Sequence, residues 1–315
     1  MESIWSVGRC LMLLCLVAHA ATATVLQNAL YSDDMMLVSG SSYDVRPFVS
    51  GFTSTAGEAV SVTFMGHTYN TTSSEEKNDE NSTVGCPTCA YNWEVQMNTC
   101  YGASKNHTLV VRGASNTLTY TNVACGQVYL CSGQSNMELT MDYVDGGAAI
   151  AHAFNYSSSW RLFRVAHGMN DVPQLTVNSS SGGWQVATEE LVQQFSATCF
   201  LTARHLEEIL WNDSPFGLIW SAWGGTRVEA WTPDTKAAGC APTAPEGKQQ
   251  ASAVLYNAMI HPLSRYSVRG AFWFQGTRPA LRVRLCFAGG TAPLTSRVLP
   301  APPPALPLPK GSTML

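Results

Sequence analysis

The sequence predicts an α/β protein in which an all-β, sandwich-like region precedes an incomplete parallel-sheet domain covered by helices. Short runs of alternating apolar and polar residues fill residues 24–124, which is typical of strands. From residue 125 onward, apolar strands alternate with helical segments, as in parallel sheets. Residues 277–315 fit neither pattern, because they are rich in proline. We therefore expect four segments: 1–23, 24–124, 125–276 and 277–315.

The first segment has the features of a signal peptide. Arg9 precedes an apolar run over residues 10–17, and small residues that fit the A-x-A cleavage rule follow at 18–23. This run is too short to cross a bilayer, and no later segment has about 18 consecutive apolar residues. We expect a protein of the secretory pathway, secreted or lysosomal, without a membrane span.

The cysteines and the glycosylation motifs agree with that compartment. Cys86 and Cys89 form a C-x-x-C pair without a second ligand pair at zinc spacing, so we expect no metal. Disulfides among Cys86, Cys89 and Cys100 suit an oxidising compartment, and their pairing stays open. Six N-x-[ST] motifs predict N-glycosylation, at Asn70, Asn81, Asn106, Asn155, Asn178 and Asn212.

The charge of the chain excludes one class of partner. Only 13% of the residues are charged and the formal net charge is −4. Nucleic-acid binding needs a basic surface that displaces counterions from phosphates, and no basic stripe is present. We expect no nucleic-acid partner.

The all-β region contains short alternating runs separated by clusters of Gly, Ser, Asn and Asp. This arrangement indicates an antiparallel sandwich. The runs that we expect to form strands are residues 45–49, 60–64, 108–112 and 118–121.

The parallel-sheet region begins with an apolar strand at residues 126–130. Further buried strands are expected at 216–220 and 268–274, with helices at 191–210 and 252–261 between them. The proline-rich residues 277–315 cannot form a packed strand–helix unit, so we expect this segment to be disordered.

Two turns in this region contain the residues that we expect to take part in a reaction. Residues 128–137 predict a buried strand that enters a tight turn at Gly133, with Ser135 in the first turn of the next element. Unpaired N–H groups at such a position favour an oxyanion, although a capping serine is the alternative interpretation. Gly224 and Gly225 follow the strand 216–220, and adjacent glycines expose N–H groups as an oxyanion hole requires. An ordinary strand-to-helix loop is the alternative there.

Four stretches together resemble the sialate O-acetylesterases, secreted members of the SGNH-type serine esterases. They are GQVYLCSGQSNM (126–137), SAWGGT (221–226), LYNAMIHPL (255–263) and WFQG (273–276). The resemblance implies an N-terminal β domain followed by a flavodoxin-like α/β domain. It also implies a hydrolase that removes acetyl groups from the hydroxyls of sialic acids without metal or cofactor. The implied partner is an O-acetylated sialic acid or sialoglycan.

Carried over to this sequence, the family pattern makes Ser135 the nucleophile. The N–H of Ser135 and that of Gly224 or Gly225 would be the oxyanion donors. After Gln275 and Gly276 the family continues with an acidic residue, an oxyanion Asn and later the Asp and His of the triad. Residues 277–315 here contain no acidic residue and no histidine. We therefore expect no triad Asp or His, and a truncated or alternatively spliced form with little or no turnover.

The other histidines and acids are expected to have structural or solvated roles. His261 is predicted to end a helix, and Asp142 and Asp145 to lie on a helix surface. For His152, His167 and His205 the sequence shows no partner. An uncovered sheet edge would expose apolar side chains and favour aggregation, with Trp220, Phe272, Trp273 and Phe274 as candidates.

Two other functions compete with the esterase. A secreted, non-catalytic glycan-binding or interaction module built on the β region would leave Ser135 unreactive. A lipase of the α/β-hydrolase type fits poorly, because its nucleophile motif is G-x-S-x-G and Met137 stands at the position of the last glycine.

Overall fold

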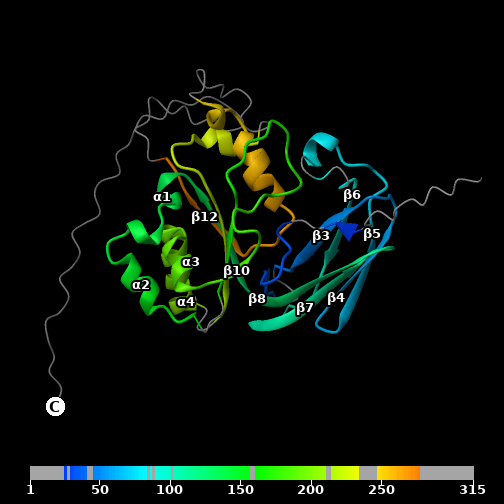
Figure 1. Cartoon of the computed structure of the whole chain (residues 1–315), viewed down its shortest axis with the longest axis horizontal. Coiled ribbons are helices and arrows are strands. Elements are labelled where there is room, and N and C mark those ends of the chain that lie inside the picture. Colours follow the sequence, from blue (N-terminus) through cyan, green and yellow to red (C-terminus); the bar gives the residue numbers. More distant parts are fainter. Residues whose placement is uncertain are drawn as a thin grey trace, which may run out of the picture.

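The computed structural model describes residues 25–26, 29–40, 45–83, 86, 89–100, 102–156, 160–210, 214–233 and 247–276. Figure 1 shows a β-rich half, in blue and cyan, beside a half that carries the helices α1 to α4. The predicted signal peptide (1–23), Asn212 and the proline-rich segment 277–315 lie outside the described residues.

The β-rich half consists of short strands and one 3-10 turn. An antiparallel three-stranded sheet has the order β1-β3-β6. The predicted strand at 60–64 is confirmed, whereas that at 45–49 begins only at Phe48, since Pro47 has no N–H to donate to a ladder. The elements are β1 Val25–Leu26, β2 Met36–Val38, β3 Phe48–Thr53, β4 Ala59–Phe64, β5 His67–Thr72, η1 Glu80–Thr83, β6 Tyr91–Gln96 and β7 Ser104–Arg112.

One long strand, β8 (Thr117–Gly133), runs through both halves (Figure 1). Its first part is antiparallel to β7, and its second part is parallel to three other strands. Burial is mixed up to Asn122 and nearly continuous from Val123 onward. The expected boundary between residues 124 and 125 falls inside this strand, two residues after the change in burial. The division into domains stays a prediction.

The nine-stranded sheet has the order β10-β9-β11-β8-β7-β4-β5, with β2 and β12 also on β8. Parallel pairing joins β8, β9 (Arg161–Arg164), β11 (Phe216–Ala222) and β12 (Gly270–Phe274), and β10 (Gln185–Val186) is antiparallel to β9. The architecture is thus mixed α/β, with parallel pairing where the sequence predicted it.

The last strand differs from its prediction. β12 begins at Gly270 instead of 268 and is largely exposed, whereas the strand pattern predicted burial. The exposure of Trp273 (47%) and Phe274 (42%) confirms the expectation of exposed apolar side chains at a sheet edge. Among the described residues β12 pairs with β8 alone, which leaves its other edge uncovered. Trp220, by contrast, was expected to be exposed and is 2% accessible, because β11 lies between β8 and β9.

The predicted helix over 191–210 is two helices, α3 (Glu189–Gln193) and α4 (Ala197–Leu210). Ser196 explains the break, since its hydroxyl accepts from the Cys199 N–H at 3.2 Å and donates to the Met137 carbonyl at 2.6 Å. The predicted helix at 252–261 is a π-helical turn, η6 (Tyr256–Ile260), followed by the 3-10 turn η7 (His261–Leu263). The remaining elements are α1 Ser135–Glu138, η2 Met141–Tyr143, α2 Gly147–Ala153, η4 Val228–Trp231 and η5 Lys248–Gln250.

Two buried clusters pack against the two faces of β8. Val128 belongs to the cluster shared with the β-rich half, whereas Tyr129 and Cys131 belong to the cluster beneath the helices. Successive side chains of a strand point to opposite faces, so a single strand supplies both cores.

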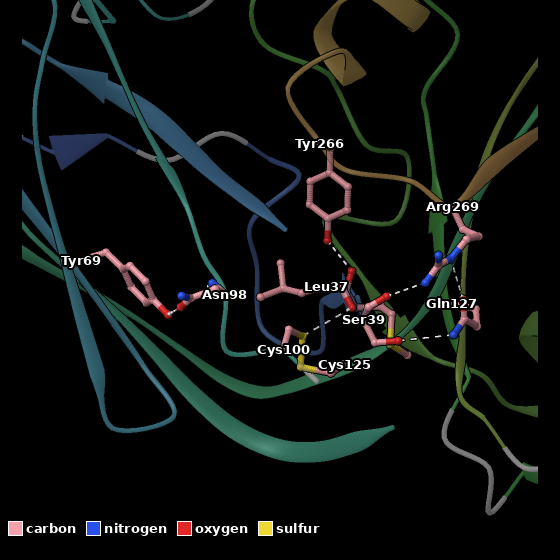
Figure 2. The surroundings of a disulfide bond; sticks show 10 residues. Leu37, Ser39, Tyr69, Asn98, Cys100, Cys125, Gln127, Tyr266 and Arg269 are labelled. Atoms are coloured by element: carbon pink, nitrogen blue, oxygen red, sulfur yellow. Dashed lines mark hydrogen bonds between the residues drawn. A yellow bond between two sulfur atoms is a disulfide. The ribbon is translucent and has the colours of Figure 1, made fainter. Parts of the chain in front are cut away.

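Three disulfides are present among the described residues: Cys86–Cys89 closes a short loop before β6, whereas Cys100–Cys125 and Cys131–Cys199 each anchor β8. Figure 2 shows the second of these, which joins the segment after β6 to β8. The segment before β12 lies nearby. There Arg269 donates to the Gln127 side chain at 3.0 Å and to the Ser39 carbonyl at 2.7 Å.

In the described part of the chain, no group of His, Cys, Asp or Glu side chains lies together in a way that could hold a metal ion.

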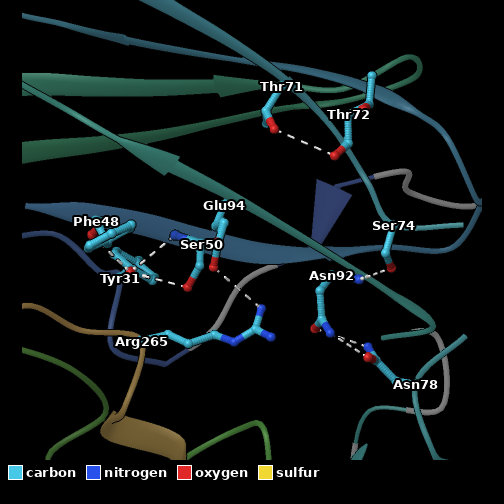
Figure 3. Close-up of polar contacts among 10 residues, drawn as sticks. All are labelled: Tyr31, Phe48, Ser50, Thr71, Thr72, Ser74, Asn78, Asn92, Glu94 and Arg265. Carbon is cyan, nitrogen blue, oxygen red and sulfur yellow. Dashed lines mark hydrogen bonds and ion pairs between the residues drawn. The ribbon is translucent and has the colours of Figure 1, made fainter. Parts of the chain in front are cut away.

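The segment before β12 also contacts the three-stranded sheet (Figure 3). Arg265 lies 3.9 Å from Glu94 on β6, an exposed pair of small energetic weight. Nearby, the buried Tyr31 hydroxyl donates to the Phe48 carbonyl and accepts from the Ser50 N–H. Burial raises the pKa of Tyr31 to about 12, so this phenol stays neutral.

Across the described residues, no helix has the length and apolar character needed to cross a membrane.

Candidate active site

Ser135 is the first residue of α1, directly after the carboxyl end of β8, and it is exposed. The turn before it requires glycine: Gly133 has φ +143°, and a Cβ there would lie 2.1 Å from the Phe274 carbonyl oxygen. The Gln134 N–H donates to the same carbonyl at 3.1 Å. The Cys131–Cys199 disulfide ties β8 to α4 two residues before the turn. Ser135 is therefore presented to solvent from a rigid base.

The Gly224–Gly225 turn lies next to Ser135. It follows β11, the parallel neighbour of β8, and Ala222 pairs in register with Gly133. A Cβ built on Gly224 would lie 3.5 Å from both Cα and Cβ of Ser135. The structure thus brings together the two segments that the sequence singled out, at the sheet edge where ligands of open α/β sheets bind.

The two glycines differ in what their N–H groups do. The Gly224 N–H donates to a carboxylate oxygen of Glu138 at 2.5 Å. Gly225 is exposed, has φ +74°, and a Cβ there would meet nothing within 4 Å. Over the described ranges, neither the Gly225 N–H nor the Ser135 N–H has an acceptor from the protein. These two donors are available to a substrate.

Glu138 also binds a histidine. Its other carboxylate oxygen lies 2.9 Å from His167 Nε2, which is 3.0 Å from the Ala222 carbonyl as well. The imidazole stacks on Trp223, with ring centroids 4.2 Å apart. Because the Ala222 carbonyl can only accept, Nε2 carries a proton.

The electrostatics of Glu138 favour its ionised form. Burial acts to raise the pKa of this carboxyl, but the hydrogen bonds from His167 and Gly224 and the charges of His167 and Arg164 outweigh it. The net pKa is lowered. A carboxylate consequently lies beside Ser135 at neutral pH.

Glu138 and His167 are the site residues that sequence reasoning missed. His167 was expected to have no partner, and the structure corrects this, because β8, β9 and β11 end side by side. The spacing Ser135-x-x-Glu138 matches a capping box, which would have drawn attention to the glutamate. In the structure its carboxylate reaches across to Gly224 instead.

The remaining candidates lie where structural roles were expected. His261 Nδ1 is 2.7 Å from the Gln174 carbonyl, and His152 pairs with Glu189 at 3.0 Å on the surface. Asp142 and Asp145 are exposed. His205 is 3.8 Å from Glu208 on α4.

The hydroxyl of Ser135 lacks a base in the described part of the chain. No histidine or carboxylate there makes a hydrogen bond to Ser135 Oγ. His167 does not fill this role in the observed arrangement, since its hydrogen-bond partners there are Glu138 and the Ala222 carbonyl and not Ser135 Oγ.

The predicted glycosylation sites that can be described are all exposed: Asn70, Asn81, Asn106, Asn155 and Asn178. Their positions are compatible with attached glycans, and the modification itself stays a prediction.

Comparisons with known proteins converge on one family. The model of a carbohydrate esterase family, the sialic acid-specific acetylesterases, matches residues 125–284. The sialate O-acetylesterases of Pongo abelii and Homo sapiens are each 32% identical over 173 residues, covering 51% of this chain and 32% of theirs. The chain thus spans about a third of the length of these curated relatives.

A solved structure agrees with the family match. A carbohydrate acetylesterase from Xanthomonas citri superposes with a TM-score of 0.64 at 26% identity, over 80% of this chain and 51% of that one. The likeness therefore extends beyond the region matched by the family model and includes part of the β-rich half.

Proposed function

The chain belongs to the family of sialic acid-specific carbohydrate acetylesterases, and we propose that it hydrolyses O-acetyl esters of sialic acids with Ser135 as nucleophile. The members of this family are hydrolases. One observation carries the proposal: the exposed Ser135 adjoins a glycine turn whose second N–H is unoccupied, at the carboxyl edge of parallel strands.

The proposed reaction is acyl transfer in two steps. Ser135 Oγ bonds to the acetyl carbon as its proton passes to solvent water, and the carbonyl oxygen becomes an oxyanion held by the N–H groups of Ser135 and Gly225. Collapse breaks the ester bond, returns a proton to the sugar hydroxyl and leaves acetyl-Ser135. Water then releases acetate and restores the serine. Each donor of this kind contributes about 2.7–4 kcal/mol of transition-state stabilisation.

Gly224 has a different part in this proposal. Its N–H is held by Glu138, so it supports the turn and leaves Gly225 as the donor to the oxyanion. The sequence could not choose between the two glycines, and the hydrogen bond to Glu138 is the reason for the choice made here.

We also propose that turnover is slow. Ser135 lacks a hydrogen-bonded base among the described residues, and residues 277–315 contain no Asp, Glu or His that could correspond to the family's triad partners. Serine hydrolases without a complete triad retain about 10³–10⁴-fold catalysis over water from the oxyanion hole and binding. A rate in that low range is what this arrangement supports.

Release of acetate tests the proposal. The purified chain is incubated with an O-acetylated sialic acid, and acetate is measured enzymatically beside the Ser135→Ala variant. Slow release that disappears in the variant is the expected result. An equal rate in both proteins would show that Ser135 is not the nucleophile.

A second candidate is a secreted, non-catalytic glycan-binding module, favoured by the missing base at Ser135. A fluorophosphonate probe discriminates the two, because only a reactive serine is labelled covalently. Binding of sialoglycans without labelling of Ser135 would favour the module over the esterase.

We propose a location in the secretory pathway, with the protein secreted or lysosomal. The exposed N-x-[ST] asparagines and the three disulfides support an oxidising compartment. Expression in animal cells followed by endoglycosidase treatment tests this, since removal of N-glycans would lower the apparent mass. A chain that carries no glycan would contradict the proposal.

A further inference from the structure

A pocket of about 280 Å³ lies between β9, β10 and α3, apart from Ser135 itself. Its polar lining comes from Arg164, Ser180, Ser181, Gln185 and Gln194. Leu162, Leu191 and Phe195 form an apolar wall. A pocket slightly smaller than the usual range of ligand sites, which begins at about 300 Å³, fits one end of a sugar rather than an oligosaccharide.

Arg164 gives this pocket a positive charge that the protein does not neutralise by contact. The guanidinium is stacked over the Trp220 ring, with Cζ 4.4 Å from the centroid, which holds it by a cation–π interaction. Within the described ranges, no carboxylate forms an ion pair with it. An arginine held in this way presents its planar fork of N–H donors to an incoming anion.

Two amides add donors to the same pocket. The side chains of Gln185 and Gln194 make no hydrogen bond with any group in the part of the chain that the structure describes. Ser180 and Ser181 are already engaged, since their hydroxyls donate to the carbonyls of Arg164 and Gly183. The donors available to a ligand are thus the guanidinium and the two amides.

The pocket belongs to the same edge of the sheet as Ser135. Arg164 is the last residue of β9 and pairs in register with Trp220 of β11, which pairs with Cys131 of β8, four residues before Ser135. The charge of Arg164 is also among the smaller causes that lower the pKa of Glu138. The pocket and Ser135 thus lie at the carboxyl ends of β9 and β8, with β11 between them.

We propose that the Arg164 pocket binds the carboxylate of the sialic acid whose O-acetyl group is attacked by Ser135. This inference rests on the proposed function, and it assigns the recognition of the acid to residues 164, 185 and 194. A carboxylate matches the arginine fork in a bidentate arrangement, and the apolar wall faces the sugar carbons. A neutral acetylated sugar would lack this contact.

Binding of N-acetylneuraminic acid and of its methyl ester tests the proposal. Both are titrated into the Ser135→Ala chain by saturation-transfer NMR, so that turnover cannot interfere. We expect the acid to bind about 10- to 100-fold more tightly than the ester, as charge-assisted hydrogen bonds predict. Arg164→Met should abolish this preference and leave the binding of the ester unchanged.

Two further variants complete the design. Arg204→Met is the matched control, because Arg204 is a partly exposed arginine on α4 that pairs with Glu208. It should bind both ligands as the parent does. Arg164→Lys keeps the charge without the fork, and it should recover only part of the preference. Arg164 lies on the surface, so the variants should melt as the parent does.

Three results would overturn the proposal: equal affinity for acid and ester, an unchanged preference in Arg164→Met, or tighter binding of inorganic sulfate or phosphate than of the acid. Hydrolysis of the neutral ester p-nitrophenyl acetate distinguishes failure of the proposed Arg164 pocket from failure of the proposed esterase function. Ser135-dependent hydrolysis without a preference for the acid overturns the pocket alone. A preference for the acid without Ser135-dependent hydrolysis overturns the esterase alone.

Discussion

The carboxylate of Glu138 accepts a hydrogen bond from the backbone N–H of Gly224 at 2.5 Å, and this contact joins the helix of the nucleophile to the turn after β11. A carboxylate in this position prevents the Gly224 N–H from serving an oxyanion. It also keeps the turn beside Ser135, so close that a Cβ on Gly224 would lie 3.5 Å from Cα and Cβ of the serine. Its principal effect is thus to position the Gly225 N–H relative to the serine.

The first prediction concerns this contact. Glu138→Gln should lower the rate at which a fluorophosphonate labels Ser135 about tenfold, because a neutral amide accepts from Gly224 more weakly than a carboxylate does. Time courses of labelling measure the rate. Glu189→Gln is the matched control, since Glu189 also pairs with a histidine, His152, at 3.0 Å but far from Ser135. An equal loss in both variants would contradict a positioning role for Glu138.

The second prediction is a pH dependence of stability. Glu138 has a lowered pKa in the folded protein, so its contribution is fully present above the unfolded value, about 4.5, and is lost as the pH falls through the folded value. The difference in melting temperature between the parent and Glu138→Gln should therefore be constant near neutral pH and shrink below about pH 4.5. Melting curves from pH 7 to pH 3 measure it. A difference that grows on acidification would contradict the assignment.

The third prediction uses two glycines with positive φ. Gly133→Ala should destabilise the protein by more than about 3 kcal/mol, because the new Cβ would lie 2.1 Å from the backbone carbonyl of Phe274. Gly182→Ala is the matched control: φ is +77°, but nothing lies within 4 Å, so only the backbone strain of about 1 kcal/mol applies. Urea denaturation measures both. Similar losses would mean that the turn before Ser135 can move away from β12.

The local sequence pattern was sufficient to predict the nucleophile Ser135, but it did not predict the residues that surround it. Ser135 and the Gly224–Gly225 turn each follow an apolar strand, so a few consecutive residues predict them. The Glu138–His167 contact joins the last residue of α1 to the loop after β9, and only the parallel order of β8, β11 and β9 brings them together. No periodicity within either segment contains that information.

The same distinction explains the errors in the fold. The strand at 60–64 was predicted because its alternation is local. The break between α3 and α4 depends on a Ser196 hydroxyl that bonds to the Met137 carbonyl, 59 residues away in the chain. The burial that the apolar pattern of 268–274 predicted is absent from β12, because the sheet order decides which strands flank it. Cys100 likewise pairs with Cys125, outside the group of three that the sequence suggested.

The last prediction concerns the disulfide beneath the nucleophile. Replacing Cys131 and Cys199 together by alanine should cost about 2–5 kcal/mol, because this bond closes a long loop, with a sequence separation of 68. The matched control is the double replacement of Cys86 and Cys89, whose separation is only 3, and it should cost much less. Denaturation of both variants without reductant gives the two free energies. Since Cys131 lies four residues before Ser135, the first variant should also be labelled more slowly by a fluorophosphonate, and the second should not. An unchanged labelling rate in the first variant would show that β12 and α1 hold the serine without the help of α4.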